Sequence, residues 1–322
     1  MSEKELVLVA GSGGFDSTIN LALIQLAGYK NIIAVHFNYG TISQLAEELA
    51  IKNITKELNI PLRIFNLESI YTEIDVKNIS MLTNRNIPTI TGTKIGLKST
   101  AAWHPCRNLL MQNVMFTLAE AEIMKHNYNT VYFVAGWQSM SEASTYPDNS
   151  KYFSDACFGA AKYGSLVGNR FKILYSLCNI MKFEQYVLMK EFNLQNVYCL
   201  TISCDRATVE TPSCDHTIIN HIPKDSAGSV PCNCMKNGIP ACGSGLLAWW
   251  SSKMIGLDDM KLRNYYELPS NEKYEAYVPK HLLQNIKRIP DINTIIDRIL
   301  LPPDKLNNLR KQLNENKKLI SQ

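Results

Sequence analysis

The sequence predicts an α/β protein with a doubly wound, mostly parallel β-sheet that carries helices on both faces. Short runs rich in Val, Ile and Leu alternate with longer segments whose apolar residues recur at helical spacing. This alternation is typical of a parallel sheet covered by helices. A glycine-rich turn over residues 11–17 also joins the first apolar run to the first helical segment, where α/β sheets bind ligands.

Two strand–helix units and a third strand make up the first part of the chain. Gly28 follows the first helix as a C-cap, and Pro61 lies just beyond the end of the second. The expected elements are, in order, strand 5–10, helix 16–27, strand 31–38, helix 43–59 and strand 61–67.

A long polar segment over residues 68–103 interrupts this alternation and is expected to be a functional or disordered loop. The alternation then resumes and brings the total to about six strands before Cys204, within the usual range for such a sheet. The expected elements are helix 108–125, strand 130–135, a loop over 136–149, helix 152–166, strand 171–177, helix 182–192 and strand 196–202.

Composition shifts divide the chain into three parts. We expect an α/β domain over residues 1–203, a cysteine-rich segment over 204–250 and a small helical C-terminal appendage over 251–322. Leucines at helical spacing support the last helix, and the basic residues at its tip are interpreted as a solvated face. These are Leu306, Leu309 and Leu313, and Arg310, Lys311, Lys317 and Lys318.

Composition and charge limit the classes of protein. Hydrophobic residues make up 46% and charged residues 19% of the 322 residues, which is typical of a packed soluble protein. The longest apolar runs are far short of a membrane span, and no signal segment precedes them, so we expect a cytoplasmic protein without a membrane partner. The net charge of +4 gives no strong signal for nucleic-acid binding.

The glycine-rich turn is the strongest chemical signal in the sequence. Glycines let the backbone approach an anion closely, and the amides that open the following helix supply donors. No Gly-Lys-Ser/Thr follows, so the turn is not a Walker motif, and the spacing of its glycines does not fit GxGxxG. The alternative is a plain tight turn with Asp16 as an N-cap.

The stretch SGGFDS, residues 12–17, resembles the SGGxDS signature of the PP-loop ATP pyrophosphatases. That resemblance implies that the loop holds pyrophosphate released from ATP when a substrate is adenylated. It also implies that Asp16 helps to hold Mg²⁺, while the Ser12 and Ser17 hydroxyls and the Gly13 and Gly14 amides bind phosphate oxygens.

Further stretches line up in order with one PP-loop subfamily, 7-cyano-7-deazaguanine synthase (QueC). His36-Phe-Asn-Tyr-Gly40 is similar to its FDYGQ, and Pro105-Cys-Arg-Asn108 to its PGRN. Gly136 with Tyr146-Pro-Asp148 and Phe153 resembles its substrate segment. Lys182, Ser203-Cys204 and Cys242-Gly243 match later positions. The resemblance covers about three-quarters of the chain, from residue 6 to 250.

The resemblance implies an adenine nucleotide alpha hydrolase-like fold, a homodimer, and an enzyme that converts 7-carboxy-7-deazaguanine to a nitrile with ATP and ammonia. Gly136 would contact ATP, and the cations Arg107 and Lys182 would lie near the phosphates or the activated carboxylate. Tyr146, Asp148 and Phe153 would contact the deazaguanine, Phe153 by stacking. Asp148 as a plain turn residue is an equal alternative.

Five of the nine cysteines fall between Cys204 and Cys242, where a tetrahedral Zn²⁺ site would need four of them. The family arrangement favours Cys204, Cys232, Cys234 and Cys242 as structural zinc ligands, with Cys214 in reserve and His216 and His221 nearby. Free thiols are the alternative. Cys106, Cys157, Cys178 and Cys199 are interpreted as small hydrophobic residues.

Several departures from the family pattern leave the acceptor and the end point open. Asn38 replaces Asp, Cys106 replaces Gly, and Asn149-Ser150 replaces Cys-Arg after the Tyr-Pro-Asp stretch. The reaction could stop at the amide, or serve DNA rather than tRNA modification. The chain could also be a different PP-loop ligase, a tRNA-modifying enzyme such as a thiolase, or a zinc-stabilised nucleotide-binding module without catalysis.

Overall fold

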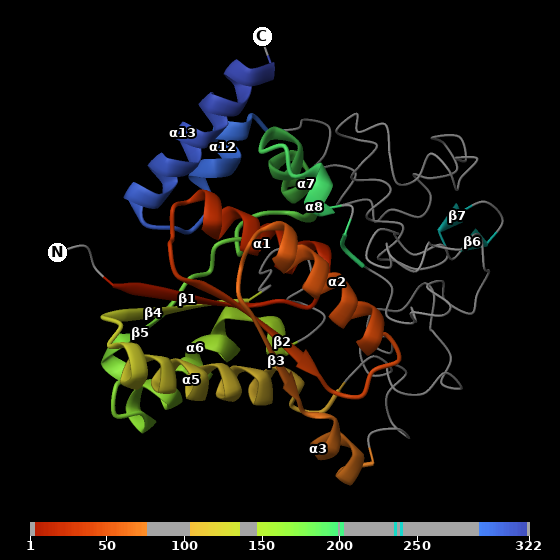
Figure 1. Cartoon of the computed structure of the whole chain (residues 1–322), viewed down its shortest axis with the longest axis vertical. Helices are drawn as coiled ribbons and strands as arrows, with labels where there is room; N and C mark the ends of the chain where they lie inside the picture. The colour runs from red at the N-terminus through yellow and green to blue at the C-terminus, as the bar shows by residue number, and fades with distance from the viewer. Residues whose placement is uncertain are drawn as a thin grey trace.

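The computed structural model describes residues 4–75, 104–135, 147–198, 200–202, 235–236, 239–240 and 290–320. Its centre is a five-stranded sheet with the order β3-β2-β1-β4-β5, in which all neighbours are parallel (Figure 1). The α/β fold with a parallel sheet is therefore confirmed. The strands are β1 (Glu5–Ala10), β2 (Ile32–Asn38), β3 (Leu62–Asn66), β4 (Thr130–Val134) and β5 (Phe171–Ile173).

Helices cover both faces of the sheet (Figure 1). Side chains of β1 alternate between the two layers, with Val7 and Val9 in one hydrophobic cluster and Leu6 and Leu8 in the other. The first cluster includes α1 (Phe15–Leu26), α2 (Gln44–Glu57), α7 (Lys182–Glu191), α8 (Gln195–Tyr198), α12 (Ile292–Asp297) and α13 (Pro303–Ile320). The second includes α3 (Glu68–Glu73), α5 (Arg107–His126) and α6 (Lys151–Gly164).

The strand expected over residues 196–202 is wrong, because this stretch begins with the helical turn α8. Tyr198 packs its ring 5.4 Å from Phe15 and 5.6 Å from Tyr186, measured between ring centroids. This packing outweighs the strand preference of Val and Tyr. The described residues therefore form five strands in the central sheet rather than about six, and the strand expected at 171–177 is only Phe171–Ile173.

Short elements complete the described residues. The helix α3 lies at the start of the segment expected to be a polar loop. Two 3₁₀ turns, η2 (Pro147–Asn149) and η3 (Gly168–Arg170), flank α6. Two two-residue strands, β6 (Met235–Lys236) and β7 (Ile239–Pro240), pair antiparallel.

The C-terminal helices α12 and α13 share the hydrophobic cluster of α1 and α7. Ile295 and Ile296 of α12 are fully buried, as is Leu309 of α13. The Asn308 side chain also donates to the carbonyl of Ala27, at 3.0 Å, where α1 ends. Residues 290–320 thus belong to the same packed layer as the first helix, and the division of the chain at residues 203 and 250 stays a prediction.

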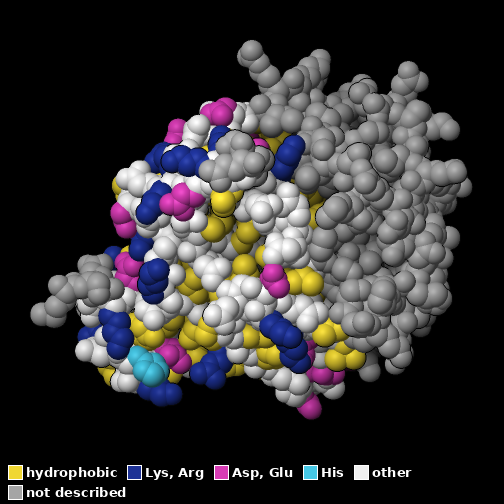
Figure 2. Space-filling view, turned by 45° about the horizontal axis from the view of Figure 1, so that its top comes forward, with side chains coloured by type: hydrophobic (Ala, Val, Ile, Leu, Met, Phe, Trp, Pro, Cys, Tyr) yellow, Lys and Arg dark blue, Asp and Glu magenta, His cyan; other side chains and the backbone are white. Residues whose placement is uncertain are grey.

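The surface of the described residues carries charges of both signs. On the face shown in Figure 2, Lys and Arg side chains are interspersed with Asp and Glu. None of the helices in the described ranges combines the length and the apolar character needed to cross a bilayer.

Candidate active site

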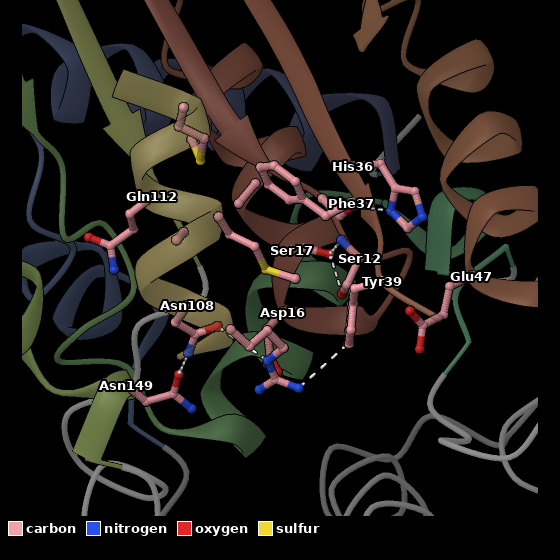
Figure 3. Close-up of a pocket in the computed structure, with 16 residues that line it drawn as sticks. Ser12, Asp16, Ser17, His36, Phe37, Tyr39, Glu47, Asn108, Gln112 and Asn149 are labelled. Atoms are coloured by element: carbon pink, nitrogen blue, oxygen red, sulfur yellow. Dashed lines mark hydrogen bonds between the residues drawn. The ribbon is translucent and has the colours of Figure 1, made fainter. Parts of the chain in front are cut away.

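A cavity of about 390 Å³ opens at the carboxyl ends of β1, β2 and β4. This is the edge where β1 is followed by the glycine-rich turn and where parallel α/β sheets bind ligands. Its walls come from that turn, from Tyr39 after β2, from Glu47 on α2 and from the first turns of α5 (Figure 3). The cavity therefore lies where the sequence predicted the nucleotide.

Two glycines of the turn, Gly11 and Gly13, are required by close packing against α2. Gly13 has φ +79°, and a Cβ atom there would lie 2.7 Å from the Glu47 carbonyl oxygen and 3.0 Å from the Ala50 Cβ. A Cβ at Gly11 would lie 2.7 Å from the Ile51 Cδ1. The turn is thus pressed between β1 and α2, which a side chain at position 13 would prevent.

The serines of the turn hold its backbone in place. The Ser12 amide donates to the Ser17 Oγ at 3.2 Å, and the Ser17 hydroxyl donates to the Gly14 carbonyl at 3.0 Å. The Gly14 amide donates to the Ser12 Oγ at 3.2 Å. Ser12, Gly13, Gly14 and Ser17 therefore form one closed turn, with the Ser12 and Ser17 side chains at the cavity (Figure 3).

Asp16 does not cap α1; its carboxylate binds Lys182 instead. The Lys182 Nζ lies 2.6 Å and 2.5 Å from the two carboxylate oxygens of Asp16. The N-cap residue of α1 is Gly14, which has no side-chain cap. Two residues 166 positions apart in the sequence, both expected in the phosphate site, are thus brought together.

The Asp16 side chain fits the expected Mg²⁺. Magnesium is usually bound by one or two carboxylates together with substrate phosphates rather than by a cage of protein ligands. Asp16 lines the cavity together with Ser12 and Ser17, so one carboxylate faces the position where the turn would hold phosphates.

Arg107 begins α5 and lines the same cavity as the turn. Its guanidinium is 5.7 Å from the centroid of the Tyr39 ring, and its Nη1 donates to the Tyr39 hydroxyl at 3.5 Å. The preceding residue, Cys106, has φ +50°, a backbone conformation that favours glycine. The PGRN pattern has a glycine at this position, and glycine adopts such a conformation without strain. Cys106 adopts it at a cost in strain.

Asp148 is buried beside this arginine. Burial raises the pKa of its carboxyl group, and the charge of Arg107 opposes that rise. Asn108 donates to the Asn149 Oδ1 at 2.9 Å (Figure 3). It also donates to the Asp148 carbonyl at 3.3 Å, and the two bonds fix the η2 turn against α5. Asp148 Oδ1 has no hydrogen-bond partner among the described residues. A turn role and a ligand-binding role are both compatible with this position.

The sequence reasoning missed a polar network behind the turn. The His36 Nδ1 lies 2.8 Å from the Gly11 carbonyl oxygen, and its Nε2 lies 3.1 Å from the Asn38 Oδ1. Asn38 in turn donates to the Glu48 carboxylate at 2.5 Å. Burial lowers the pKa of His36. The position of these side chains at the carboxyl end of β2 is the signal that would have found them.

Tyr39, Glu47, Gln112 and Asn149 also line the cavity and were not predicted as site residues. Asn108, Met111, Gln112 and Met115 recur at helical spacing, so α5 presents one face to the cavity. Met111 and Met115 make this face partly apolar, and an amide on such a face is the signal for Gln112.

Some predicted site residues do not line this cavity in the part of the chain that the structure describes. The Phe153 side chain packs against the hydrophobic cluster of α5 and α6, so its stacking on a ligand stays a prediction. Gly136 and Tyr146 lie outside the described residues. Cys204, Cys214, Cys232, Cys234 and Cys242 do so too, and the zinc site stays a prediction. Among the described residues, no three His, Cys, Asp or Glu side chains are grouped to hold a metal.

A family model described as "Queuosine biosynthesis protein QueC" matches residues 6–218. The chain belongs to the QueC family. The match includes the turn, Arg107, Asp148 and Lys182, and it ends before residues 290–320. The family membership that the sequence motifs predicted is therefore confirmed, although several of these motifs depart from the family pattern.

Curated relatives named 7-cyano-7-deazaguanine synthase are similar to the chain at low identity. The protein of Pyrococcus abyssi is 28% identical over 197 residues, covering 59% of this chain and 78% of its own length. That of Carboxydothermus hydrogenoformans is 31% identical over 194 residues, covering 58% and 82%. With the protein of Saccharolobus solfataricus, 28% identical over 182 residues, the match covers 56% of this chain and 37% of the relative.

A solved structure, the U34-tRNA thiolase NcsA from Methanococcus maripaludis, aligns with 90% of this chain and 75% of its own. The TM-score is 0.34 and the identity 12%, a similarity too low to bear on fold or function.

Proposed function

We propose that this chain is an ATP-dependent C–N ligase that adenylates the carboxylate of 7-carboxy-7-deazaguanine and adds ammonia, giving 7-cyano-7-deazaguanine for tRNA or DNA modification. The observation that supports it best is the ion pair between Asp16, which lines the same cavity as Arg107, and Lys182 at the start of α7. Membership of the QueC family and the names of the relatives support the choice of substrate.

The proposed chemistry solves a leaving-group problem. A carboxylate would have to expel oxide, whereas an acyl-adenylate expels AMP. The substrate carboxylate attacks the α-phosphorus of ATP and pyrophosphate leaves. Ammonia then attacks the acyl carbon, AMP leaves, and the amide forms as the nitrogen loses a proton. A second ATP activates the amide oxygen in the same way, and loss of AMP and of both N–H protons leaves the nitrile.

The chain's own residues mainly position groups and stabilise charge in this scheme. The turn from Ser12 to Ser17 would hold the leaving pyrophosphate, and Mg²⁺ held by Asp16 would supply positive charge there. Lys182 would move from Asp16 to a phosphate oxygen when the nucleotide binds. Arg107 would face the activated carboxylate, and Asp148 would accept from the ring N–H groups of the deazaguanine.

The zinc site belongs to the same proposal. Cys204, Cys232, Cys234 and Cys242, with Cys214 as the alternative ligand, would hold a structural Zn²⁺ with four protein ligands. Zinc would then contribute to folding rather than to the reaction.

One observation favours the amide as the final product. Asn149 stands where the family pattern has a cysteine, and it lines the cavity and accepts a hydrogen bond from Asn108. If the family cysteine serves the second activation, this chain would release the amide instead of the nitrile.

The test is incubation of the purified chain with ATP, Mg²⁺, ammonium and 7-carboxy-7-deazaguanine. Pyrophosphate release is followed, and the product is identified by mass, because amide and nitrile differ by one water. We expect Asp16→Ala to lower pyrophosphate release by about 100-fold or more. Asp155→Ala is the matched control, because Asp155 is an exposed aspartate that pairs with Lys151 on α6.

Four outcomes separate the alternatives. Pyrophosphate release with a nitrile product supports the synthase, and an amide product supports the one-step variant. No pyrophosphate release with this substrate contradicts both. Full activity of Asp16→Ala would contradict the role of the turn itself.

A further inference from the structure

The C-terminal helices reach the helix that carries Lys182. Residues 290–320 lie beyond the part of the chain that matches the QueC family model. In Figure 1, α12 and α13 nevertheless pack beside α7 on the same face of the sheet. Ile292, Ile295 and Ile296 of α12 are buried in the cluster that includes Leu188 of α7. A segment outside the family match is thus part of the packing around a predicted catalytic helix.

The start of α7 is held by Glu184. Lys182 is the first residue of this helix, and Met181 precedes it as the N-cap. The Glu184 Oε2 accepts from the Met181 amide at 2.8 Å, so the side chain closes the first turn of the helix. The backbone on both sides of Lys182 is fixed by this contact.

The second carboxylate oxygen of Glu184 is held from α12. The Arg298 Nη2 donates to the Glu184 Oε1 and forms an ion pair with it. The Glu184 side chain is only 1% exposed, whereas that of Arg298 is 34% exposed. Burying a carboxylate this deeply costs free energy unless a cation is paired with it. Arg298 therefore keeps Glu184 in the orientation that caps α7.

A second tie runs from the end of α12 to α1. The Leu300 amide donates to the Ser176 carbonyl at 3.2 Å, and the Ser176 hydroxyl donates to the Asn20 Oδ1 at 2.5 Å. Ser176 lies in the segment that leads into α7, and Asn20 lies on α1, whose first turn carries Asp16. Both helices of the Asp16–Lys182 pair are thus connected to the C-terminal segment.

We propose that Arg298 is a positioning residue for the nucleotide site: through Glu184 it sets the start of α7 so that Lys182 meets Asp16. This inference rests on the proposed function only in taking Asp16 and Lys182 as parts of a site for Mg²⁺-ATP. It gives residues 290–320 a role in the site that the family match does not include.

The experiment measures binding of α,β-methylene-ATP with Mg²⁺ by titration calorimetry, because this analogue cannot release pyrophosphate. Arg298→Met keeps the length of the side chain and removes the charge. We expect it to weaken binding by about tenfold, since it leaves the Glu184 carboxylate buried without a cation. Arg298→Lys should recover most of this loss. Arg310→Met is the matched control, because Arg310 pairs with Asp297 at the surface between α12 and α13.

The decisive variant is the double substitution Arg298→Met with Glu184→Gln. It removes both charges, and the glutamine oxygen can still accept from the Met181 amide. We expect it to bind the analogue more tightly than Arg298→Met alone. A role of Arg298 only in attaching α12 would give the same loss in both, and equal binding in the two would overturn the proposal.

Thermal unfolding is measured for every variant, so that binding is compared only between folded proteins. If Arg298→Met does not fold, Glu184→Ala carries the comparison, because it removes the side chain that closes the first turn of α7. Unchanged binding of the analogue in Glu184→Ala would overturn the proposal. Binding of the analogue to the wild-type chain separates the proposed function from the proposed role of Arg298. A wild-type chain that does not bind the analogue contradicts the proposed function, whereas tight binding that Arg298→Met leaves unchanged contradicts only the role of Arg298.

Discussion

The two sides of the cavity differ in how their polar groups are satisfied. On the side of the β1–α1 turn, Ser12, Gly14 and Ser17 bond to one another, and Asp16 binds Lys182. On the side of α5, several buried polar atoms have no hydrogen-bond partner among the described residues. They are Gln112 Oε1, which lines the cavity, and Asp148 Oδ1 and both ring nitrogens of His104, which lie next to the start of α5.

This difference indicates which side is complete and which depends on further groups. The turn is held in shape by its own chain, so its binding geometry is already formed. A buried polar atom without a partner costs about 1–3 kcal/mol, so the atoms near α5 are a cost that a ligand or another part of the chain would offset. We therefore interpret the turn as the nucleotide side and the surroundings of α5 as the side that selects the acceptor.

Arg107→Met gives the largest expected effect and assigns this cation to one side. If Arg107 belongs to the acceptor side, turnover with 7-carboxy-7-deazaguanine should fall by about 100-fold, because a charge that faces the activated carboxylate is lost. Binding of α,β-methylene-ATP, measured by calorimetry, should change little. The control is Arg170→Met, since Arg170 bonds to Asn127 and Tyr128 at the surface.

An equal loss of nucleotide binding in Arg107→Met would contradict this assignment and move Arg107 to the phosphate side. Arg107→Lys adds a second comparison. It keeps the charge but loses the planar guanidinium that lies over the Tyr39 ring, so activity between that of the wild type and that of Arg107→Met would show that the stacking contributes.

Sequence reasoning predicted the two sides unequally. The turn could be found because its glycines, serines and aspartate are contiguous and follow a strand. The pairing of Asp16 with Lys182 was expected only as a shared site, since 166 residues separate them. The ion pair between Arg298 and Glu184 on α7 was not predicted, because a single arginine such as Arg298 has no local pattern that distinguishes it from a surface charge.

The misassigned strand at 196–202 has a related cause. Val197 and Tyr198 favour strands in isolation, but they are buried against α1 and α7 as part of a helical turn. The backbone after α8 contacts the glycine-rich turn, because the Ile202 amide donates to the Gly13 carbonyl at 2.9 Å. Tertiary packing, which a local pattern does not contain, decided both features.

Gly13→Ala tests whether the turn side is as rigid as its contacts indicate. The alanine would need φ near +79° and would place its Cβ 2.7 Å from the Glu47 carbonyl oxygen. A strain of about 1–3 kcal/mol follows, so we expect α,β-methylene-ATP to bind about tenfold more weakly. Titration calorimetry measures this directly.

The matched control for Gly13→Ala is Gly159→Ala on α6, where a Cβ would meet nothing within 4 Å. It should leave nucleotide binding unchanged and raise helix stability by up to about 1 kcal/mol. Unchanged nucleotide binding in Gly13→Ala would show that the turn can move, and the contrast between the two sides would then be wrong.

His104→Phe has the smallest expected effect on activity and tests the α5 side through its pH dependence. Burial, and then the charge of Arg107, lower the pKa of His104 to about 4, while the backbone of Tyr39 opposes this shift without meeting hydrogen-bond geometry. The ring packs between the Tyr39 and Tyr71 rings, at 5.2 Å and 4.4 Å between centroids. Phenylalanine keeps this packing and removes the titrating nitrogens.

The sign of the pH effect follows from proton uptake. Between about pH 4 and 6.5 the unfolded chain protonates His104 and the folded chain does not, so the free energy of unfolding falls as the pH falls through this range. Urea unfolding of His104→Phe across this pH range should show a smaller fall than urea unfolding of the wild type. Parallel curves for the wild type and His104→Phe would mean that His104 is paired in solution, and the α5 side would then be as complete as the turn.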